Sequence, residues 1–411
     1  MLLYTGYELN RRAGAPVAAA LGLSAKLIRS LPDQVSELSG VRGVWAAFEV
    51  LSRARASHIR PPFAISSVFL DGREVAVQER SSPMSPFATM IHFAKPSREA
   101  AQPKVLVVGP LSGHFTTLIR PTIRTLLAEH DVHVLDWLNA RDVPAGHGAF
   151  GLDDYVEHVM DAVRALGPDT HVVAVCQPAV PVLTAVSVLA AIGDVQPATL
   201  TLIAGPIDTR VNPNKINDLA NSKPLSYFER RVIGAVPACY AGAGRRVYPG
   251  FVQLAAFMSM NPRRHIDAYV GMYRSLVIGD TDRAESTQRF YDEYGAVMDV
   301  HADFYLETVD QIFQRNLLAR GDATWRGEPV DPSAIRRTAL LTIEGANDDL
   351  CSPGQTHAAH RLCTAVPDQH KVHHLQPGVG HYGVFSGSRW EAEVYPIIRD
   401  FIAAHETALA G

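Results

Sequence analysis

A cysteine follows a predicted buried strand in HVVAVCQPAVPVL, residues 171–183. Apolar residues run up to Cys176, and helical spacing begins after Pro178. A side chain at such a strand-to-helix turn projects from the carboxyl edge of a sheet, where helix N–H groups stabilise a thiolate or an oxyanion. Taken alone, the segment favours a buried cysteine over a nucleophile, because cysteine is among the residues most often buried.

Two acidic residues and a histidine follow later predicted strands. Asp348 and Asp349 lie in ANDDLCSPGQT after ALLTIEG, and His381 lies between glycines in GVGHYGVF after KVHHL. A nucleophile, then an acid, then a histidine, each just past a successive strand, is the chain order of the α/β-hydrolase triad. We predict Cys176 as the nucleophile, His381 as the base and Asp348 as the acid that orients it, with Asp349 as the alternative acid.

Backbone N–H groups beside the cysteine are expected to form an oxyanion hole. The loop GPLSGHF opens a helix at the end of the predicted strand KVLVVG, a position that supplies one such donor. We predict the N–H groups of Leu111 or Ser112, together with that of Gln177. Proline is compatible with the turn at Pro178, because the first helical turn leaves its N–H groups without helical partners.

Other reactive side chains favour neither a phosphate site nor a metal site. His114 and Arg120 could suggest phosphate binding, but no GxGxxG or Walker pattern accompanies them. One short segment is rich in metal-type side chains whose spacing does not match structural zinc sites: Cys351, His357, His360 and Cys363. His373 and His374 fall in a predicted strand and are interpreted as structural. We predict no metal and no cofactor.

The elements that must position these residues alternate from Lys104 onward. Short apolar runs (KVLVVG, VHVLDW, HVVAV, ATLTLIAG, ALLTIEG, KVHHL) are separated by helical patterns and are followed by the amphipathic segment RWEAEVYPIIRDFIAAH. Buried strands that alternate with helices of 10–15 residues predict βαβ units and a parallel sheet. We therefore predict the α/β class, with an α/β-hydrolase fold: a mostly parallel central sheet with helices on both faces.

The alternation of strands and helices stops between the predicted strands ATLTLIAG and ALLTIEG. The sequence pattern there is helical and shows no strands. We divide the chain into an N-terminal helical arm (1–60), a hydrolase core (61–206 and 337–411) and a helical cap inserted between them (207–336). The two clearest helices of the cap are PRRHIDAYVGMYRSLVIG and DVHADFYLETVDQIFQRNLLARG. Asp71-Gly72 predicts a β-hairpin, and SSPMSPF predicts a loop from its proline and serine content.

Composition restricts the class of protein. The chain has 411 residues, 47% of them hydrophobic, and a formal net charge of −4, so no strong positive field favours nucleic acid. No uncharged apolar run approaches the length of about 18 residues that a transmembrane helix needs. Four cysteines without a CxxC pair, and an N-terminus that does not resemble a secretion signal, lead us to expect a reducing cytoplasm.

The sequence resembles the intracellular polyhydroxyalkanoate (poly-3-hydroxybutyrate) depolymerases, α/β-hydrolase-like enzymes with a cysteine nucleophile. The motifs that carry the resemblance are GPLSGHFTTLIRPT, DWLNARDVP with GLDDYVEHV, VCQPAVPVL, EGANDDLCSPGQTH and GVGHYGVFSGSRW. The resemblance implies that Cys176, Asp348 and His381 form the catalytic triad. It also implies a carboxylic ester hydrolase that lies on a cytoplasmic storage granule and releases 3-hydroxybutyrate or oligomers through an acyl-cysteine.

Several alternatives stay open. A thioester can pass to another thiol, so coenzyme A is an alternative acceptor to water. The polymer synthases of the same storage cycle have glycines on both sides of their cysteine, and Ala174 and Pro178 here favour a depolymerase over a synthase-like acyltransferase. A small-ester cysteine hydrolase and an inactive granule-coating protein are further alternatives. Aromatic and methionine residues of the insertion, Phe257 and Met260 among them, could form a granule-docking face or the insertion's own core.

Overall fold

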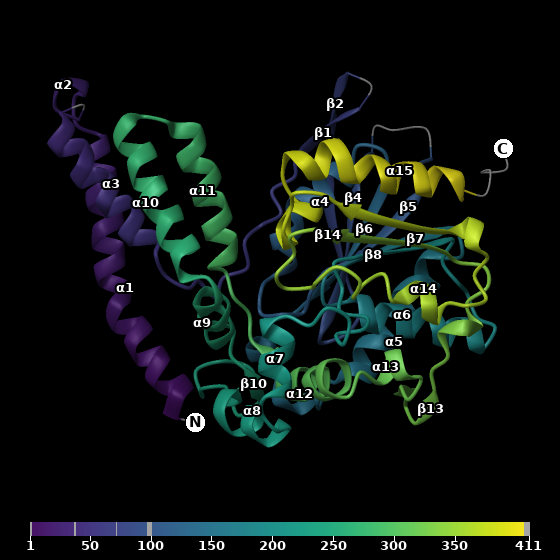
Figure 1. The fold of residues 1–411 in the computed structure, drawn as a ribbon. Helices are drawn as coiled ribbons and strands as arrows, with labels where there is room; N and C mark the ends of the chain where they lie inside the picture. The colour runs from purple at the N-terminus through teal and green to yellow at the C-terminus, as the bar shows by residue number, and fades with distance from the viewer. Residues whose placement is uncertain (1, 37, 71, 97–100, 407–411) are drawn as a thin grey trace.

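An eight-stranded sheet forms the centre of the protein in the computed structural model, which describes residues 2–36, 38–70, 72–96 and 101–406 (Figure 1). The strand order is β3-β4-β6-β5-β7-β8-β14-β15. Strand β4 runs antiparallel to β3 and β6, and every other adjacent pair in the sheet is parallel. This is the order of an α/β-hydrolase sheet, so the predicted fold class is confirmed. The bounds are β3 (Gln78–Pro83), β4 (Ala88–Ala94), β5 (Lys104–Val108), β6 (Asp131–Trp137), β7 (Thr170–Val175), β8 (Thr199–Ile203), β14 (Ala339–Gly345) and β15 (Lys371–Gln376).

Helices cover both faces of this sheet (Figure 1). One face packs against α4 (Arg120–Leu126) and α15 (Tyr395–Ala404), and the other packs against α5 (Leu152–Leu166) and α6 (Ala179–Ala191). The inner strands are buried on both sides, which explains their continuous apolar runs. Helix α6 is apolar on nearly all sides because it is buried from Ala179 to Leu189.

The prediction that SSPMSPF is a loop was wrong for Ser81, Ser82 and Pro83, which belong to β3, and correct for residues 84–87, which join β3 to β4. Every residue of β3 is exposed, and Pro83 ends the strand at the edge of the sheet. An edge strand without a buried face carries no apolar alternation, and proline is tolerated there because no inner neighbour needs its N–H. The predicted hairpin is formed by β1 (Ser67–Leu70) and β2 (Arg73–Ala76), although Asp71 itself lies outside the described residues.

The insertion between β8 and β14 is mainly helical but not all-helical, which corrects the prediction of a helical cap without strands. Three short strands, β9 (Gly234–Ala235), β10 (Arg246–Tyr248) and β11 (Val300–His301), pair as a small antiparallel sheet. Strands of two or three residues are too short to show a period of two. The helices are α7 (Lys215–Asn221), α8 (Leu225–Val232), α9 (Gly250–Met260), α10 (Pro262–Ile278), α11 (Thr281–Tyr294), α12 (Ala302–Glu307) and α13 (Leu317–Arg320), and a π-helical segment, η4 (Thr308–Gln314), continues α12.

The second predicted cap helix, which was to continue to Arg320, is broken at Asn316. The backbone of Asn316 is left-handed, with φ of 52°. Its side-chain Oδ1 accepts hydrogen bonds from the N–H of Thr209 at 3.1 Å and from the Thr209 hydroxyl at 2.8 Å. Asparagine adopts this conformation more readily than most residues and gains a local partner by doing so, and the helix therefore ends there.

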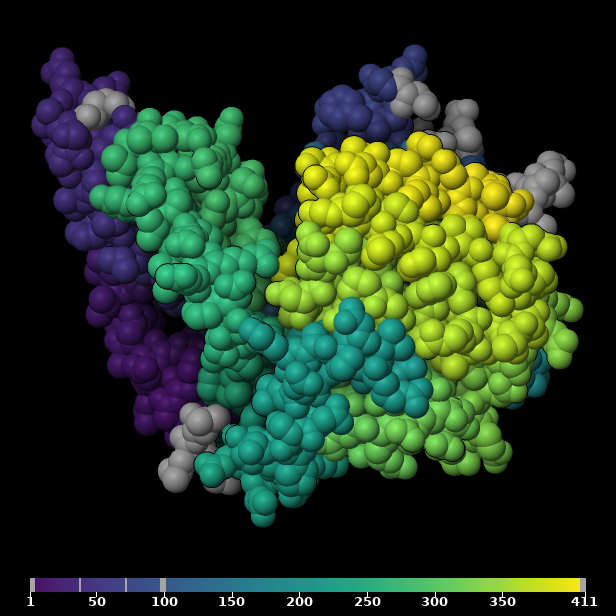
Figure 2. All heavy atoms as spheres, in the orientation of Figure 1, coloured from purple at the N-terminus to yellow at the C-terminus, as the bar shows by residue number. Residues whose placement is uncertain are grey.

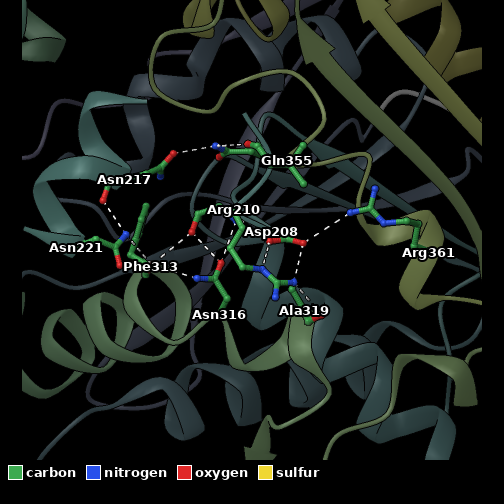
Figure 3. Close-up of polar contacts among 11 residues, drawn as sticks. Asp208, Arg210, Asn217, Asn221, Phe313, Asn316, Ala319, Gln355 and Arg361 are labelled. Atoms are coloured by element: carbon green, nitrogen blue, oxygen red, sulfur yellow. Dashed lines mark hydrogen bonds and ion pairs between the residues drawn. The ribbon is translucent and has the colours of Figure 1, made fainter. Parts of the chain in front are cut away.

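Polar side chains join the start of the insertion to the core (Figure 3). Arg210 pairs with Asp208 at 2.8 Å, and Arg361 of the core approaches the same carboxylate at 3.6 Å. Gln355 of the core donates its Nε2–H to Asn217 Oδ1 at 2.9 Å. Asp208, Asn217 and Gln355 are buried, so these contacts fix α7 to the loop that follows β14.

The N-terminal helices pack against part of the insertion. Helices α1 (Leu2–Arg29) and α3 (Ser39–Arg53) lie beside α10 and α11, and we call these four helices the helical lobe; the short α2 (Asp33–Ser36) joins α1 to α3. The lobe stands next to the hydrolase core, and Figure 2 shows a hollow between its upper part and the core. The division into arm, core and cap remains a prediction. Within the described ranges, no helix combines the length and the apolar character that crossing a bilayer requires.

We predict that Asn316→Ala lowers the free energy of unfolding by about 2 kcal/mol, because alanine is strained at positive φ and leaves Thr209 without its acceptor. Asn316→Gly should cost less, since glycine adopts this backbone freely but still removes the acceptor. Urea denaturation of both variants measures the difference. Equal stability of wild type and both variants would contradict this account of the helix break.

Candidate active site

Cys176 occupies the strand-to-helix turn that the sequence indicates. It lies between the end of β7 at Val175 and the start of α6 at Ala179, with φ of 69°. Its N–H donates to Ile203 O of the neighbouring strand at 2.7 Å, and its side chain remains half-buried. The left-handed backbone turns the thiol away from the strand direction and toward the carboxyl edge of the sheet.

Two small or rigid residues make this turn possible. A Cβ on Gly205 would lie 2.1 Å from Ala179 Cβ and 2.9 Å from Cys176 O, so the turn needs glycine at the end of the adjacent strand β8. Pro178 has φ of −59° and ψ of −17°, and its carbonyl accepts the N–H of Val182 at 2.9 Å. Pro178 therefore enters the first helical turn without losing a hydrogen bond.

The structure brings the three predicted triad residues into one hydrogen-bonded chain. His381 Nε2 lies 3.1 Å from Cys176 Sγ, and His381 Nδ1 lies 2.8 Å from Asp348 Oδ2. The other oxygen of Asp348 accepts the N–H groups of Leu350 at 2.8 Å and Cys351 at 2.9 Å. Asp348 is buried whereas Asp349 is exposed, so the geometry favours Asp348 as the acid.

The pKa of His381 is raised well above its usual value. Burial alone lowers this pKa, but the adjacent Asp348 carboxylate and the Cys176 sulfur outweigh burial and favour the imidazolium. Because both side chains of the His381–Asp348 pair are almost inaccessible to water, solvent screens their attraction little. The arrangement can therefore hold a thiolate beside an imidazolium, the pair that a cysteine nucleophile requires.

The loop predicted to supply an oxyanion donor lies against the turn. Leu111 N–H donates to the side-chain Oε1 of Gln177 at 3.2 Å, and Ser112 follows Leu111 in the same loop. The Leu111 N–H thus lies beside the residue that follows the nucleophile, and the Gln177 side chain must move before this N–H can bind an oxyanion. The sequence did not indicate a role for the Gln177 side chain, whose Nε2 is buried without a hydrogen-bond partner among the described residues.

Aromatic side chains from the insertion border the histidine. The Tyr382 ring lies 5.6 Å from the His381 ring, between centroids, and contacts the rings of Phe290 at 5.9 Å and Tyr294 at 6.4 Å. Phe257 packs in the same cluster and lies 5.9 Å from the His114 ring. The position of Phe257 favours the interpretation as packing beside the site over that as an exposed docking face.

The alternative phosphate site finds no support in the geometry. His114 is buried, its Nε2 bonds to Tyr294 O at 3.0 Å, and burial lowers its pKa to about 4. Arg120 pairs with Glu293 at 2.6 Å and donates to Pro62 O at 2.5 Å. Both side chains therefore join the loop after β5 to neighbouring segments.

The side chains of the alternative zinc cluster make separate contacts. Cys363 is buried in the core beside α5 and α6, and burial raises its pKa to about 12, which keeps it a thiol. His360 Nε2 and His373 Nδ1 share the hydroxyl of Thr342, each at 2.9 Å. The His357 ring packs against those of His360 and His373, with centroids 4.7 and 4.0 Å apart.

A cavity of about 390 Å³ opens near the ends of β5 and β6. Trp137 in its wall donates Nε1–H to Gly109 O at 3.2 Å, which joins the wall to the loop that carries Leu111. Phe115, Leu138 and Asn139 also line the cavity. The cavity therefore combines apolar rings and a polar amide with charged side chains, Arg60 and Asp142. Small-molecule pockets commonly combine an apolar lining with a few polar groups.

Comparison with known proteins identifies one sequence family. Residues 204–406 match the family described as "PHB de-polymerase C-terminus", a region that includes Asp348 and His381. The match confirms the resemblance to the polyhydroxyalkanoate depolymerases and the prediction of a carboxylic ester hydrolase. Among curated proteins, none matches the chain.

Solved structures with similar architecture are distant. An α/β hydrolase from a Penicillium species is 16% identical (TM-score 0.43; 80% of this chain and 98% of that chain covered). A thermophilic esterase from Thermogutta terrifontis is 13% identical (0.42; 83% and 98%), and a monoacylglycerol lipase from Paleococcus ferrophilus is 10% identical (0.44; 80% and 99%). The fold assignment above rests on the strand order instead.

We predict that Asp348→Asn reduces kcat/KM by about 1000-fold or more and moves the alkaline limb of its pH profile to lower pH. The Asp348 carboxylate raises the pKa of His381 and so keeps the imidazolium present at higher pH. Without that carboxylate the pKa of His381 falls, and the alkaline limb should move down by about 1 pH unit or more. The measurement is kcat/KM against pH on a soluble ester. Asp349→Asn is the matched control and should leave the profile unchanged; the same alkaline limb in Asp348→Asn would exclude the proposed pairing.

We predict that Gly205→Ala lowers the free energy of unfolding by about 1–3 kcal/mol and also lowers activity, because the added methyl group collides with Ala179 at the turn. Gly271→Ala on α10 is the control, since an added Cβ there meets nothing within 4 Å. Urea denaturation and ester hydrolysis measure both effects. A Gly205→Ala protein that matches wild type in both would show that the close approach is unimportant.

Proposed function

Residues 204–406 match the family described as "PHB de-polymerase C-terminus", and from this premise we propose that the chain cleaves ester bonds of stored poly-3-hydroxybutyrate through an acyl-cysteine. The observation that carries the proposal is the continuous chain Cys176–His381–Asp348, with contacts of 3.1 and 2.8 Å. Each member follows a different strand of the sheet, as in α/β-hydrolase triads. The substrate would be the water-insoluble polyester of a cytoplasmic storage granule.

The reaction follows from the geometry of these groups. The Cys176 thiolate attacks an ester carbonyl carbon, and His381, oriented by Asp348, holds the proton taken from the thiol. Backbone N–H groups of Gln177 and of Leu111 or Ser112 stabilise the negative oxygen of the tetrahedral intermediate. His381 then gives its proton to the leaving alkoxide, and the acyl group remains on the sulfur as a thioester.

The second half of the reaction releases the acyl group. Water attacks the thioester, His381 takes a proton from that water, and a 3-hydroxy acid or an oligomer leaves while the cysteine sulfur is regenerated. A thiol such as coenzyme A can replace water at this step, because thioester exchange changes the free energy little. The released product, a free acid or a coenzyme A thioester, distinguishes the two acceptors.

The cavity beside Trp137 offers room for part of the polymer. A chain bound across the turn needs apolar contacts for its methyl groups and donors for its ester carbonyls, and Phe115, Leu138 and Asn139 provide these chemical types. Phe115 lines this cavity, and Leu111 of the same loop contacts Gln177, the residue after the cysteine. We propose that the cavity receives a segment of polymer next to the bond that is cleaved.

We predict that Cys176→Ala and Cys176→Ser each lose at least about 1000-fold of the activity on amorphous poly-3-hydroxybutyrate granules. The assay measures the release of 3-hydroxy acid or oligomers, with and without coenzyme A. Cys239→Ser, which changes an exposed cysteine, is the control and should retain full activity. Full activity of Cys176→Ala would indicate that this cysteine is not the nucleophile, and polymer growth from a coenzyme A thioester would indicate a synthase.

A further inference from the structure

Large apolar side chains are exposed mainly on the helical lobe. Of the twenty-one that are exposed among the described residues, thirteen lie on α1, α2, α3, α10 or the joints between the first three helices. A soluble protein scatters single apolar residues over its surface, but a concentration of this kind marks a contact site. The joint between α1 and α3 alone contributes Leu31, Val35 and Leu38.

The outer face of α1 carries a continuous apolar stripe. Successive members are separated by four and three residues in turn, so they fall on one side of the helix over about 27 Å. All of them are exposed, and Leu9, Leu23 and Leu27 are 66%, 60% and 59% exposed. We call this set the α1 stripe; its members are Leu9, Ala13, Pro16, Ala20, Leu23 and Leu27.

The opposite face of α1 explains why the stripe is free. Helix α1 packs against α3, and its first turns are fixed to the insertion by Tyr4, whose hydroxyl donates to the buried Asp299 carboxylate. Tyr7 stacks on Phe251 with ring centroids 3.7 Å apart. The helix is therefore held in place from its inner side, and the stripe faces outward.

The charges around the stripe argue against a second copy of this chain as its partner. No charged residue lies between Arg12 and Lys26, and the one acidic residue of α1, Glu8, is buried and paired with Arg11 at 2.9 Å. Two copies joined through this stripe would place basic residues near one another without acidic partners. Paired helices of a coiled coil instead carry complementary charges beside the apolar seam.

The same features suit a neutral surface rich in ester oxygens. Apolar residues in the middle of the helix can bury against methyl and methylene groups, while the exposed Arg12 and Lys26 beside the stripe can donate hydrogen bonds to carbonyl oxygens. Amphipathic helices with uncharged apolar faces and basic residues beside them bind interfaces in this orientation. The substrate in the proposed function is such a solid polyester.

The lobe that carries the stripe is packed directly onto the candidate active site. Ala46 of α3 and Met272 of α10 share one apolar cluster, which joins α3 to α10. Helix α11 then contributes Phe290 and Tyr294, which contact Tyr382, the residue after His381. A surface bound by α1 would therefore be held at a fixed distance from the nucleophile.

We propose that the α1 stripe, with the exposed apolar residues of α3 and the joint between them, is the surface by which the protein docks on solid poly-3-hydroxybutyrate. This inference rests on the proposed function, and it assigns granule docking to the helical lobe and not to the insertion residues near Phe257. Docking keeps the enzyme at the polymer surface, whereas the triad acts on the ester bonds.

The test is the double variant Leu23→Glu/Leu27→Glu, with Leu23→Ser/Leu27→Ser as a milder second variant. The matched control is Ile192→Glu/Leu219→Glu, since these two residues are 59% and 56% exposed and lie outside the lobe. Binding is measured by sedimentation with amorphous poly-3-hydroxybutyrate granules free of protein and phospholipid. Activity is measured on those granules and on soluble 3-hydroxybutyrate oligomers, and thermal unfolding is recorded for each protein.

We expect both α1 variants to bind granules at least tenfold more weakly and to degrade them correspondingly more slowly, with unchanged activity on soluble oligomers. The control should match wild type throughout. Granule binding equal to wild type in a folded α1 variant overturns the inference. If the glutamate variant unfolds, the serine variant is used for this test.

Two further outcomes would also overturn it. Wild type that sediments with anionic phospholipid vesicles but not with bare polyester would identify a lipid surface, and a wild-type dimer that the α1 variants convert to monomers would identify a second copy. Failure of the proposed function has a different signature: no Cys176-dependent release of product from the soluble oligomers, whatever the binding to granules.

Discussion

The left-handed backbone at Cys176 is the constraint on which the rest of the site depends. A non-glycine residue with φ of 69° is strained, by an order of 1–3 kcal/mol, and the surrounding structure must offset that strain. The bond from Cys176 N–H to Ile203 O, the absence of a side chain at Gly205 and the helical φ of Pro178 all hold the turn. The thiol consequently points away from the core of the sheet without freedom to turn back.

The order of strands then places the partners of the thiol. Strands β7, β8, β14 and β15 are consecutive in the sheet, so the loops after β7, β14 and β15 meet at one edge. His381 and Asp348 are both buried, and the second oxygen of Asp348 is held by two backbone N–H groups, which fixes the carboxylate in position. A charge pair in such an environment is weakly screened, and the Asp348 carboxylate therefore raises the pKa of His381 despite its burial.

Much of this arrangement could be predicted from the sequence, because strands buried on both faces have continuous apolar runs and their ends carry the reactive side chains. The sequence pattern could not decide between Asp348 and Asp349, because both are aspartates in the same loop. Only the direction in which each side chain points separates them, and the sequence does not give that direction. Strands β3 and β9 to β11 were missed because an exposed edge strand and strands of two or three residues show no periodicity. The packing of α10 on α3 joins segments more than 200 residues apart, and no local pattern encodes such a contact.

The central claim is that Cys176 carries the acyl group during ester cleavage. Rapid acid quenching during turnover of a soluble 3-hydroxybutyrate oligomer, followed by mass spectrometry of the peptide that contains Cys176, tests this claim most directly. The account predicts an added hydroxyacyl group on Cys176 in wild type, with a larger amount when hydrolysis of the thioester is slow. Turnover at the normal rate with Cys176 unmodified at every quench time would contradict it.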